Sequence, residues 1–181
     1  KGGGHLKKWL VVASIGQLPL GMVFPFTQVF AYQIKGANEF VLGAMVTGSA
    51  LASIVLAIPL GRLADRIGAR KIAIASYIAT PLALVALAQA GPSVPAWYAL
   101  WLMVSLAGCG TTPAIWARVV SLRFDSARGL ALGLMLVGTG VAAVLAPALL
   151  GPVFVEYGWR NAVLAMAAVT LAIGLPVSLL M

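Results

Sequence analysis

Six apolar segments, each about as long as a bilayer-spanning helix, constrain this chain more than any other feature of its sequence. A helix needs roughly 20 apolar residues to cross the hydrocarbon core of a bilayer. A spanning segment must also satisfy its own backbone groups, because no water is available there. The sequence therefore predicts an all-α polytopic membrane protein with a six-helix transmembrane domain over residues 9–181. The predicted helices cover residues 9–32, 40–60, 72–90, 96–117, 130–153 and 162–180.

The connections between these segments are short, so we expect consecutive helices to be antiparallel neighbours. Residues 40–60 are rich in Gly, Ala, Ser and Thr, which allow helices to pack closely in lipid. Residues 72–90 contain few polar side chains, and we expect this helix at the periphery, against lipid. The glycine-rich opening, residues 1–5, is predicted to be flexible.

The composition excludes a water-soluble domain. Hydrophobic residues make up 62% of the chain and charged residues 9%, which is too little polar surface to cover a globular protein in water. The net charge of +8 would suit a nucleic-acid-binding protein, but the basic residues lie between apolar runs, where the positive-inside rule explains them better. We therefore expect the lipid bilayer as a partner and no nucleic acid. The single cysteine, Cys109, excludes a disulfide framework.

The basic residues also predict the topology. Ten of the twelve Lys and Arg residues fall on one side of a six-helix arrangement, and only Lys35 and Arg160 fall on the other. The richer side is assigned to the cytoplasm, so residues 1–8 form a cytoplasmic N-terminal segment and both termini are cytoplasmic. We expect a multi-pass protein of a cell membrane such as a prokaryotic inner membrane. Because the first residue is Lys1, we expect either a trimmed start or a piece of a longer protein. The ten basic residues on the cytoplasmic side are Lys1, Lys7, Lys8, Arg62, Arg66, Arg70, Lys71, Arg118, Arg123 and Arg128.

The segment from Gly61 to Lys71 is the only part of the first half of the chain in which charged residues are dense. Gly61 and Gly68 are predicted to bracket a tight turn between the second and third helices, since glycine adopts positive φ without a steric cost. Asp65 lies among four cations, so it can form a local salt bridge or face the positive N-terminus of another helix. A basic loop that only sets the topology is the alternative. The four cations are Arg62, Arg66, Arg70 and Lys71.

This segment resembles the loop between the second and third helices of major facilitator superfamily transporters, in which Gly-x-Leu-x-Asp-Arg-x-Gly-Arg-Arg/Lys recurs. Ala69 departs from that pattern and displaces the basic pair by one position. The resemblance implies one six-helix half, by preference the N-terminal one, of a fold whose two halves hold the solute between them. It also implies that helices one, two, four and five face the solute path. The matching residues are Gly61, Leu63, Asp65, Arg66, Gly68, Arg70 and Lys71.

An arginine at the position of Arg118, at the cytoplasmic end of the fourth predicted helix, is common in the same superfamily. The resemblance therefore implies a salt bridge between Arg118 and Asp65, if the two helix ends are adjacent. Such a pair, with the surrounding basic residues, would act as a gating motif that latches the cytoplasmic side in one conformation.

The start of the fifth predicted helix resembles the monocarboxylate and organic-acid branch of the superfamily, whose fifth helix begins Arg-x-Leu-Ala-x-Gly-x-Ala-x-Ala-Gly. Met135 and Val137 depart from that pattern. The resemblance implies a small organic anion as the solute. The residues that carry this helix-five motif are Arg128, Leu130, Ala131, Gly133, Gly138 and Pro147, followed by Gly158, Trp159 and Arg160 in the next loop.

A competing resemblance exists for the same helix. Its small residues fall on the spacing of the antiporter motif of drug exporters, although three positions of that motif are altered here. This resemblance implies a drug/proton antiporter half as the alternative function. The residues concerned are Gly133, Ala142, Ala146, Pro147 and Gly151.

Polar side chains in the first and fourth predicted helices are candidates for lining a solute path. Two glutamines in the first helix are eleven residues apart, which returns them to nearly the same face. Four side chains in the fourth helix follow the spacing i, i+4, i+7, i+11, which predicts one shared face. Helix–helix hydrogen bonding and an ordinary packed interior are the alternatives. The candidates are Gln17, Gln28, Ser105, Cys109, Thr112 and Trp116.

No ionisable side chain lies deep inside any apolar run, so a proton-carrying carboxylate is not expected in this chain. Coupling charges must then come from a second six-helix half or a second copy of the chain. The only histidine, His5, lies outside the apolar runs, which excludes an intramembrane serine protease. We expect that the protein is not an enzyme and that it binds no metal and no cofactor. The predicted function is a secondary transporter domain that moves a small solute by alternating access, with a non-transporting membrane scaffold as a further alternative.

Overall fold

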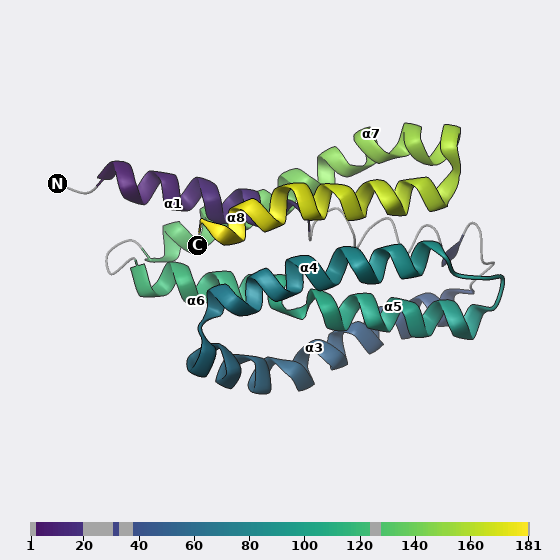
Figure 1. Ribbon diagram of the computed structural model, residues 1–181, viewed down its shortest axis with the longest axis horizontal. Helices are drawn as coiled ribbons and strands as arrows, with labels where there is room; N and C mark the ends of the chain where they lie inside the picture. The colour runs from purple at the N-terminus through teal and green to yellow at the C-terminus, as the bar shows by residue number, and fades with distance from the viewer. Residues whose placement is uncertain (1–2, 20–30, 33–37, 124–127, 181) are drawn as a thin grey trace.

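The computed structural model describes residues 3–19, 31–32, 38–123 and 128–180, and all of the elements in these ranges are helices. They lie roughly side by side in one elongated bundle (Figure 1). The helices are α1 (Gly3–Gly16), α3 (Glu39–Ile67), α4 (Ala69–Ala88), α5 (Val94–Gly108), the 3₁₀ helix η1 (Cys109–Thr111), α6 (Pro113–Arg123), α7 (Arg128–Val169), the π-helix η2 (Thr170–Gly174) and α8 (Leu175–Leu179).

Four stretches of the described residues are long and apolar enough to cross a membrane: Glu39–Leu56, Ala69–Ala88, Val94–Ser121 and Arg128–Leu179. The last contains 52 residues. A straight helix of that length would measure about 78 Å, more than twice the thickness of the hydrocarbon core. Instead, the chain reverses its direction at Gly158, which has φ 78° and ψ 168° (Figure 1). Residues 128–157 and 159–179 are therefore two antiparallel helical segments.

The turn after α3 is shorter than the sequence predicts. The helix continues through Gly61 to Ile67, and the chain turns at the single residue Gly68, which has φ 93°. The predicted turn bracketed by Gly61 and Gly68 is therefore wrong at Gly61. Glycine does not end a helix by itself, and nothing lies within 4 Å of where a side chain at Gly61 would start, so no close approach requires a glycine there.

The N-terminal end also differs from the prediction. Residues 1–5 were expected to be flexible, but α1 begins at Gly3 and ends at Gly16, and Gln17 forms a turn. Leu18 and Pro19, the next two residues, are again helical. The first predicted helix, residues 9–32, lies in part outside the described residues.

The core consists of two clusters of buried side chains, and α4 contributes to both. One cluster surrounds Trp97, Trp101 and Leu84, and the other surrounds Tyr77 and Trp116. Nine of the 20 residues of α4 are buried, against 11% of Glu39–Leu56 in α3. The expected peripheral position of the third helix is therefore wrong. That prediction rested on the small number of polar side chains, but the helix is also rich in alanine, which allows neighbouring helices to approach closely.

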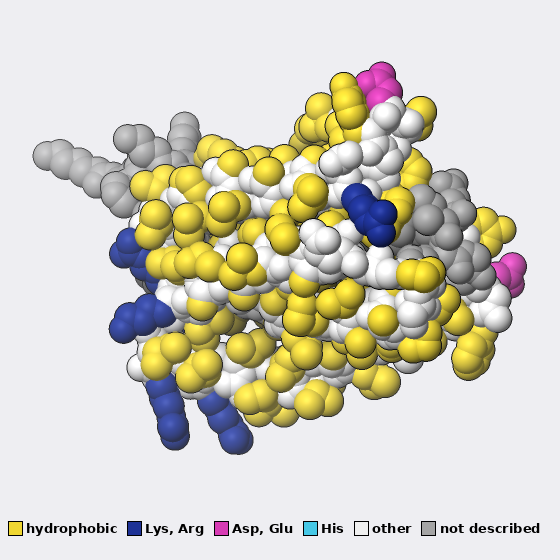
Figure 2. All heavy atoms as spheres, turned by 45° about the vertical axis from the view of Figure 1, so that its right-hand side comes forward, with side chains coloured by type: hydrophobic (Ala, Val, Ile, Leu, Met, Phe, Trp, Pro, Cys, Tyr) yellow, Lys and Arg dark blue, Asp and Glu magenta, His cyan; other side chains and the backbone are white. Residues whose placement is uncertain are grey.

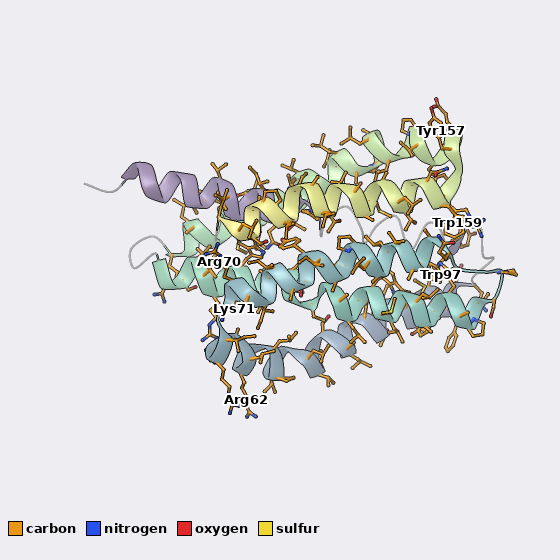
Figure 3. All side chains as sticks on the ribbon, viewed as in Figure 1. Arg62, Arg70, Lys71, Trp97, Tyr157 and Trp159 are labelled. Carbon is orange, nitrogen blue, oxygen red and sulfur yellow. The ribbon has the colours of Figure 1, made fainter. Side chains whose placement is uncertain are left out.

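The exterior of the bundle is largely apolar along its length, and charged side chains gather near its ends (Figure 2). Exposed Val55, Leu82 and Val144 are typical of this surface. In Figure 3, Arg62, Arg70 and Lys71 lie at one end and Trp97, Tyr157 and Trp159 at the other. We call the first of these the basic end. Its described cations are Arg62, Arg66, Arg70, Lys71, Arg118 and Arg128.

Candidate functional site

The helix predicted over residues 96–117 is interrupted in its middle. α5 ends at Gly108, η1 follows, and Thr112 has the extended conformation φ −63°, ψ 156° before α6 begins at Pro113. Proline lacks a backbone N–H and disfavours helix in the residue before it, which explains the break at Thr112. Two hydroxyls compensate for the lost helical hydrogen bonds. Thr111 Oγ1 donates to Gly108 O at 2.8 Å, and Thr112 Oγ1 donates to Cys109 O at 2.7 Å.

A small cavity of about 40 Å³ lies beside this interruption. By volume it would hold about three water molecules. Thr80 Oγ1 and Ser105 Oγ are buried and have no hydrogen-bond partner among the described residues, so both hydroxyls are available to a water or a polar ligand. Trp101 and Val104 form its apolar wall. The hydroxyl side chains that line it come from α3, α4, α5, η1, the Thr112 linkage and η2, and they are Ser53, Thr80, Ser105, Thr111, Thr112 and Thr170.

A larger cavity of about 370 Å³ adjoins the first, and Ser53 and Thr112 line both. It lies between α3 and the interrupted helix, where Cys109 and Pro113 form part of its wall, and it extends to Arg118. Its volume falls within the usual range for small-molecule sites, about 300 to 1,000 Å³. A broken helix beside a ligand-sized cavity is typical of transporter binding sites, because the break exposes backbone and side-chain polar groups at membrane depth.

Arg118 forms a salt bridge with Asp65, and this contact joins α6 to the last turns of α3. The pairing that we expected from the sequence is therefore present. The side chains are 40% and 52% exposed, so solvent screens the pair and it adds little to stability. Its position matters more, because Arg118 also lines the larger cavity.

The other cations of the Gly61–Lys71 segment point in different directions. Arg70 donates from a guanidinium N–H to the carbonyl oxygen of Leu179 at 2.6 Å, at the end of α8. Arg62 and Arg66 line a groove on α3, together with apolar residues. Lys71 is exposed. The segment is thus not one cluster, because a single turn at Gly68 sends its two halves along different helices.

The predicted pathway face of the fourth helix is only partly present. Ser105, Cys109 and Thr112 line one or both cavities, whereas Trp116 lines neither of them. The spacing argument assumed a continuous helix, and the break at Thr112 removes that continuity. Trp116 is fully buried, and its ring lies 2.6 Å from where a side chain at Gly16 would start. Its role is packing against α1, which corrects the prediction.

Of the two glutamine candidates, Gln17 lies among the described residues. Gln17 is completely buried, and neither polar atom of its amide has a partner among the described residues. Gln28 lies outside the described residues.

The helix-five residues lie on α7, which begins at Arg128. Gly138 packs directly on the backbone of Ser14, and Ser14 Oγ donates to Leu134 O across the same contact at 2.8 Å. Gly133 has open space around it, and Pro147 lies inside the helix. None of the helix-five residues, Arg128, Gly133, Gly138 and Pro147, lines either of the two cavities described above.

Sequence reasoning missed Thr80 and Thr170. Both are buried hydroxyl residues on helices to which we assigned no role, and both line the small cavity. A lone threonine in an apolar run was the available signal. Thr170 also begins the π-helix η2, a type of irregularity that is frequent at functional sites. The described residues contain no group of His, Cys, Asp or Glu side chains that could hold a metal ion.

The comparison with protein families agrees with this architecture. The model described as Major Facilitator Superfamily matches residues 10–181, which is nearly the whole chain. The search of curated proteins found no match. The superfamily is one of membrane transporters, and the described chain is all-helical with apolar helices long enough to be embedded in a membrane. The chain belongs to the Major Facilitator Superfamily.

Proposed function

We propose that this chain is one six-helix half of a secondary transporter, and that the larger cavity between α3 and the interrupted helix forms part of its solute path. The observation that carries this proposal is the cavity itself, about 370 Å³ in volume, beside the break at Thr112. A second half or a second copy of the chain would supply the opposite wall. Movement of the two units about the cavity would then expose it to each side of the membrane in turn.

The proposed six crossings are supported by the reversal at Gly158, which divides the longest apolar stretch into two. Together with α3, α4 and the interrupted helix this makes five. The apolar run that starts in α1 supplies the sixth. The basic end, which carries six of the described cations, is placed on the cytoplasmic side by the positive-inside rule. Cell-membrane localisation and cytoplasmic termini are part of the same proposal.

A small organic anion is the solute that we propose. Arg118 is the one basic side chain among the described residues that line the larger cavity, and a carboxylate could compete with Asp65 for it. The rest of the wall offers hydroxyls at Ser53 and Thr112, a thiol at Cys109 and apolar carbons. The apolar share of this wall favours a hydrophobic drug as the second candidate. In that case the domain would be half of a drug/proton antiporter.

Cys109 provides a direct test, because it is the only cysteine in the chain and lines the cavity. We expect the reconstituted protein to take up a radiolabelled monocarboxylate into liposomes, and N-ethylmaleimide to block this uptake. Excess substrate should slow the alkylation. Cys109→Ser should transport and resist the reagent.

The same experiment separates the alternatives. Uptake of a hydrophobic cation in place of the monocarboxylate would favour the drug exporter. A correctly inserted protein that moves neither solute, and whose alkylation neither solute slows, would contradict the proposed path and favour a scaffold.

A further inference from the structure

The outer face of α3 carries a groove at the basic end that the proposed solute path does not use. Its volume is about 290 Å³. Arg62 and Arg66 are four residues apart, so their side chains lie on one face of the helix, about 6 Å apart along its axis. Figure 3 shows Arg62 extending away from the bundle. The remaining walls of the groove are Ile58, Pro59 and Leu63.

The charge of this groove is not balanced within the described part of the chain. Asp65, the nearest carboxylate in sequence, is held by Arg118 on α6. No salt bridge to Arg62 or Arg66 exists among the described residues. Two guanidinium groups one helical turn apart repel each other, and an anion between them relieves that repulsion. Arginine binds phosphate oxygens especially well because its donors match their geometry.

The depth of the groove suits a lipid. The apolar stretch of α3 continues to Leu60, and Arg62 follows about 3 Å further along the helix axis. The headgroup layer on each side of a bilayer is about 5 to 8 Å thick, so Arg62 is at the level of the headgroups. Ile58 and Leu63 are exposed beside the arginines and continue the groove with apolar surface, where an acyl chain can pack.

We propose that this groove binds one anionic phospholipid from the adjacent leaflet. Arg62 and Arg66 hold its phosphate, and Ile58 and Leu63 contact the start of an acyl chain. The combination of two cations with apolar walls distinguishes this site from Lys71, which is exposed at the same end but does not line the groove. The site lies outside the solute path and does not depend on the proposed function.

Native mass spectrometry of the protein released from detergent tests the proposal, with phosphatidylglycerol and phosphatidylcholine of identical acyl chains as probes. We expect phosphatidylglycerol to be retained preferentially. Arg62→Gln and Arg66→Gln should each weaken its retention about fivefold, the factor that corresponds to about 1 kcal/mol per basic residue near an anionic membrane. Lys71→Gln is the matched control, since it also removes one cation from the basic end, and it should retain the lipid.

Two further measurements distinguish a lipid from the other possible occupants of the groove. Glycerol phosphate, which has the headgroup but no acyl chain, should not displace the lipid at equal concentration. Equal retention of both lipids, displacement by glycerol phosphate, or an equal loss in Lys71→Gln would overturn the proposal. A change of oligomeric state in Arg62→Gln without any change in lipid retention would also overturn it, because a second protein chain would then occupy the groove. Circular dichroism of each variant checks that its helices are intact.

Discussion

At the scale of single residues, Asp65 has the clearest connection between charge and position. It lies in the last turn of α3 and forms a salt bridge with Arg118, which lines the larger cavity, so the pair sits between the basic end and the proposed path. Exposed ion pairs contribute about 0 to 1 kcal/mol to stability, and both partners here are well exposed. Any large effect of breaking the pair should therefore appear in transport rather than in folding.

Asp65→Asn removes the charge that holds Arg118 and keeps the size of the side chain. We expect altered solute uptake with a nearly unchanged melting temperature and normal membrane insertion, because the salt bridge joins α3 to α6 but is too exposed to add much stability. Exchange of the two residues, Asp65→Arg with Arg118→Asp, should restore part of the wild-type rate. Liposome uptake and thermal unfolding in detergent measure the two effects. Unchanged uptake in the single variant would exclude the latch.

Gly138 gives a prediction about packing. A side chain there would collide with the backbone of Ser14, whereas one at Gly133 would meet nothing within 4 Å. Gly138→Ala should push α1 away from α7 and lower the free energy of unfolding by about 1 to 3 kcal/mol, as for other overpacked sites. Gly133→Ala is the control and should not destabilise. Thermal unfolding in detergent compares them, and equal melting temperatures would show that the helices separate at no cost.

At the scale of elements, two arginines hold α4 and residues 159–179 together at both ends. Each arginine is two residues after a positive-φ glycine, in Gly68-Ala69-Arg70 and Gly158-Trp159-Arg160. Arg70 donates to Leu179 O at the end of α8, and Arg160 donates to Ala88 O at 3.1 Å and Ala90 O at 3.4 Å. Because the two helical segments are antiparallel, each arginine binds the negative carboxyl end of its neighbour.

Arg160→Gln should therefore loosen the end of α4 without affecting the other end of the bundle. We expect faster amide hydrogen exchange over residues 84–90 and unchanged exchange near Leu179, with a loss of about 1 to 3 kcal/mol because the hydrogen bonds are charge-assisted. The stacking of Arg160 on Trp159, at 4.9 Å, is lost as well. Arg70→Gln should give the reverse pattern. Faster exchange at both ends in each variant would contradict the prediction, because the effect of each arginine would then not be confined to its own end of the bundle.

The elements also show which features the sequence could predict. Apolar length and flanking charge indicated the helices, and the reversal near Gly158 fell between two predicted segments. The predicted turn at Gly61 and the predicted peripheral position of α4 were wrong. Glycine and alanine are compatible with several environments, and the neighbouring helices decide which of them is adopted. Only some residues of the candidate site could be predicted from the sequence. Ser105, Cys109 and Thr112 followed from spacing, but Trp116, Thr80 and Thr170 depend on the break at Thr112 and on contacts between distant segments.

At the scale of the whole molecule, the two ends differ in composition. The basic end holds most of the described cations, while Tyr157 and Trp159 lie at the opposite end (Figure 3). Aromatic side chains are enriched where a bilayer meets water, and cations mark the cytoplasmic side. The long axis of the bundle is therefore expected to lie along the membrane normal.

Cysteine labelling tests this orientation in a Cys109→Ser background. Arg66→Cys, at the basic end, and Glu156→Cys, beside Tyr157, should react with a membrane-impermeant maleimide from opposite sides. We expect only Glu156→Cys to be labelled in intact cells and both to be labelled after permeabilisation. Labelling of both from outside would contradict the proposed crossing number and the cytoplasmic position of the basic end.

The single-residue turn at Gly68 has a mechanical consequence. Arg70 and Arg160 connect α4 to residues 159–179 at both ends, so neither helical segment can slide along the other without breaking these two charge-assisted contacts. Among the described residues, α3 has a charged contact only at the end near Gly68. It joins α4 through the single-residue turn at Gly68 and is linked to α6 by Asp65 near that turn. Far from the turn it accepts a neutral hydrogen bond, which Tyr98 Oη donates to Ala44 O at 3.0 Å. Movement within this chain should therefore be concentrated in α3. A tilt of this one helix would be enough to widen the larger cavity beside it.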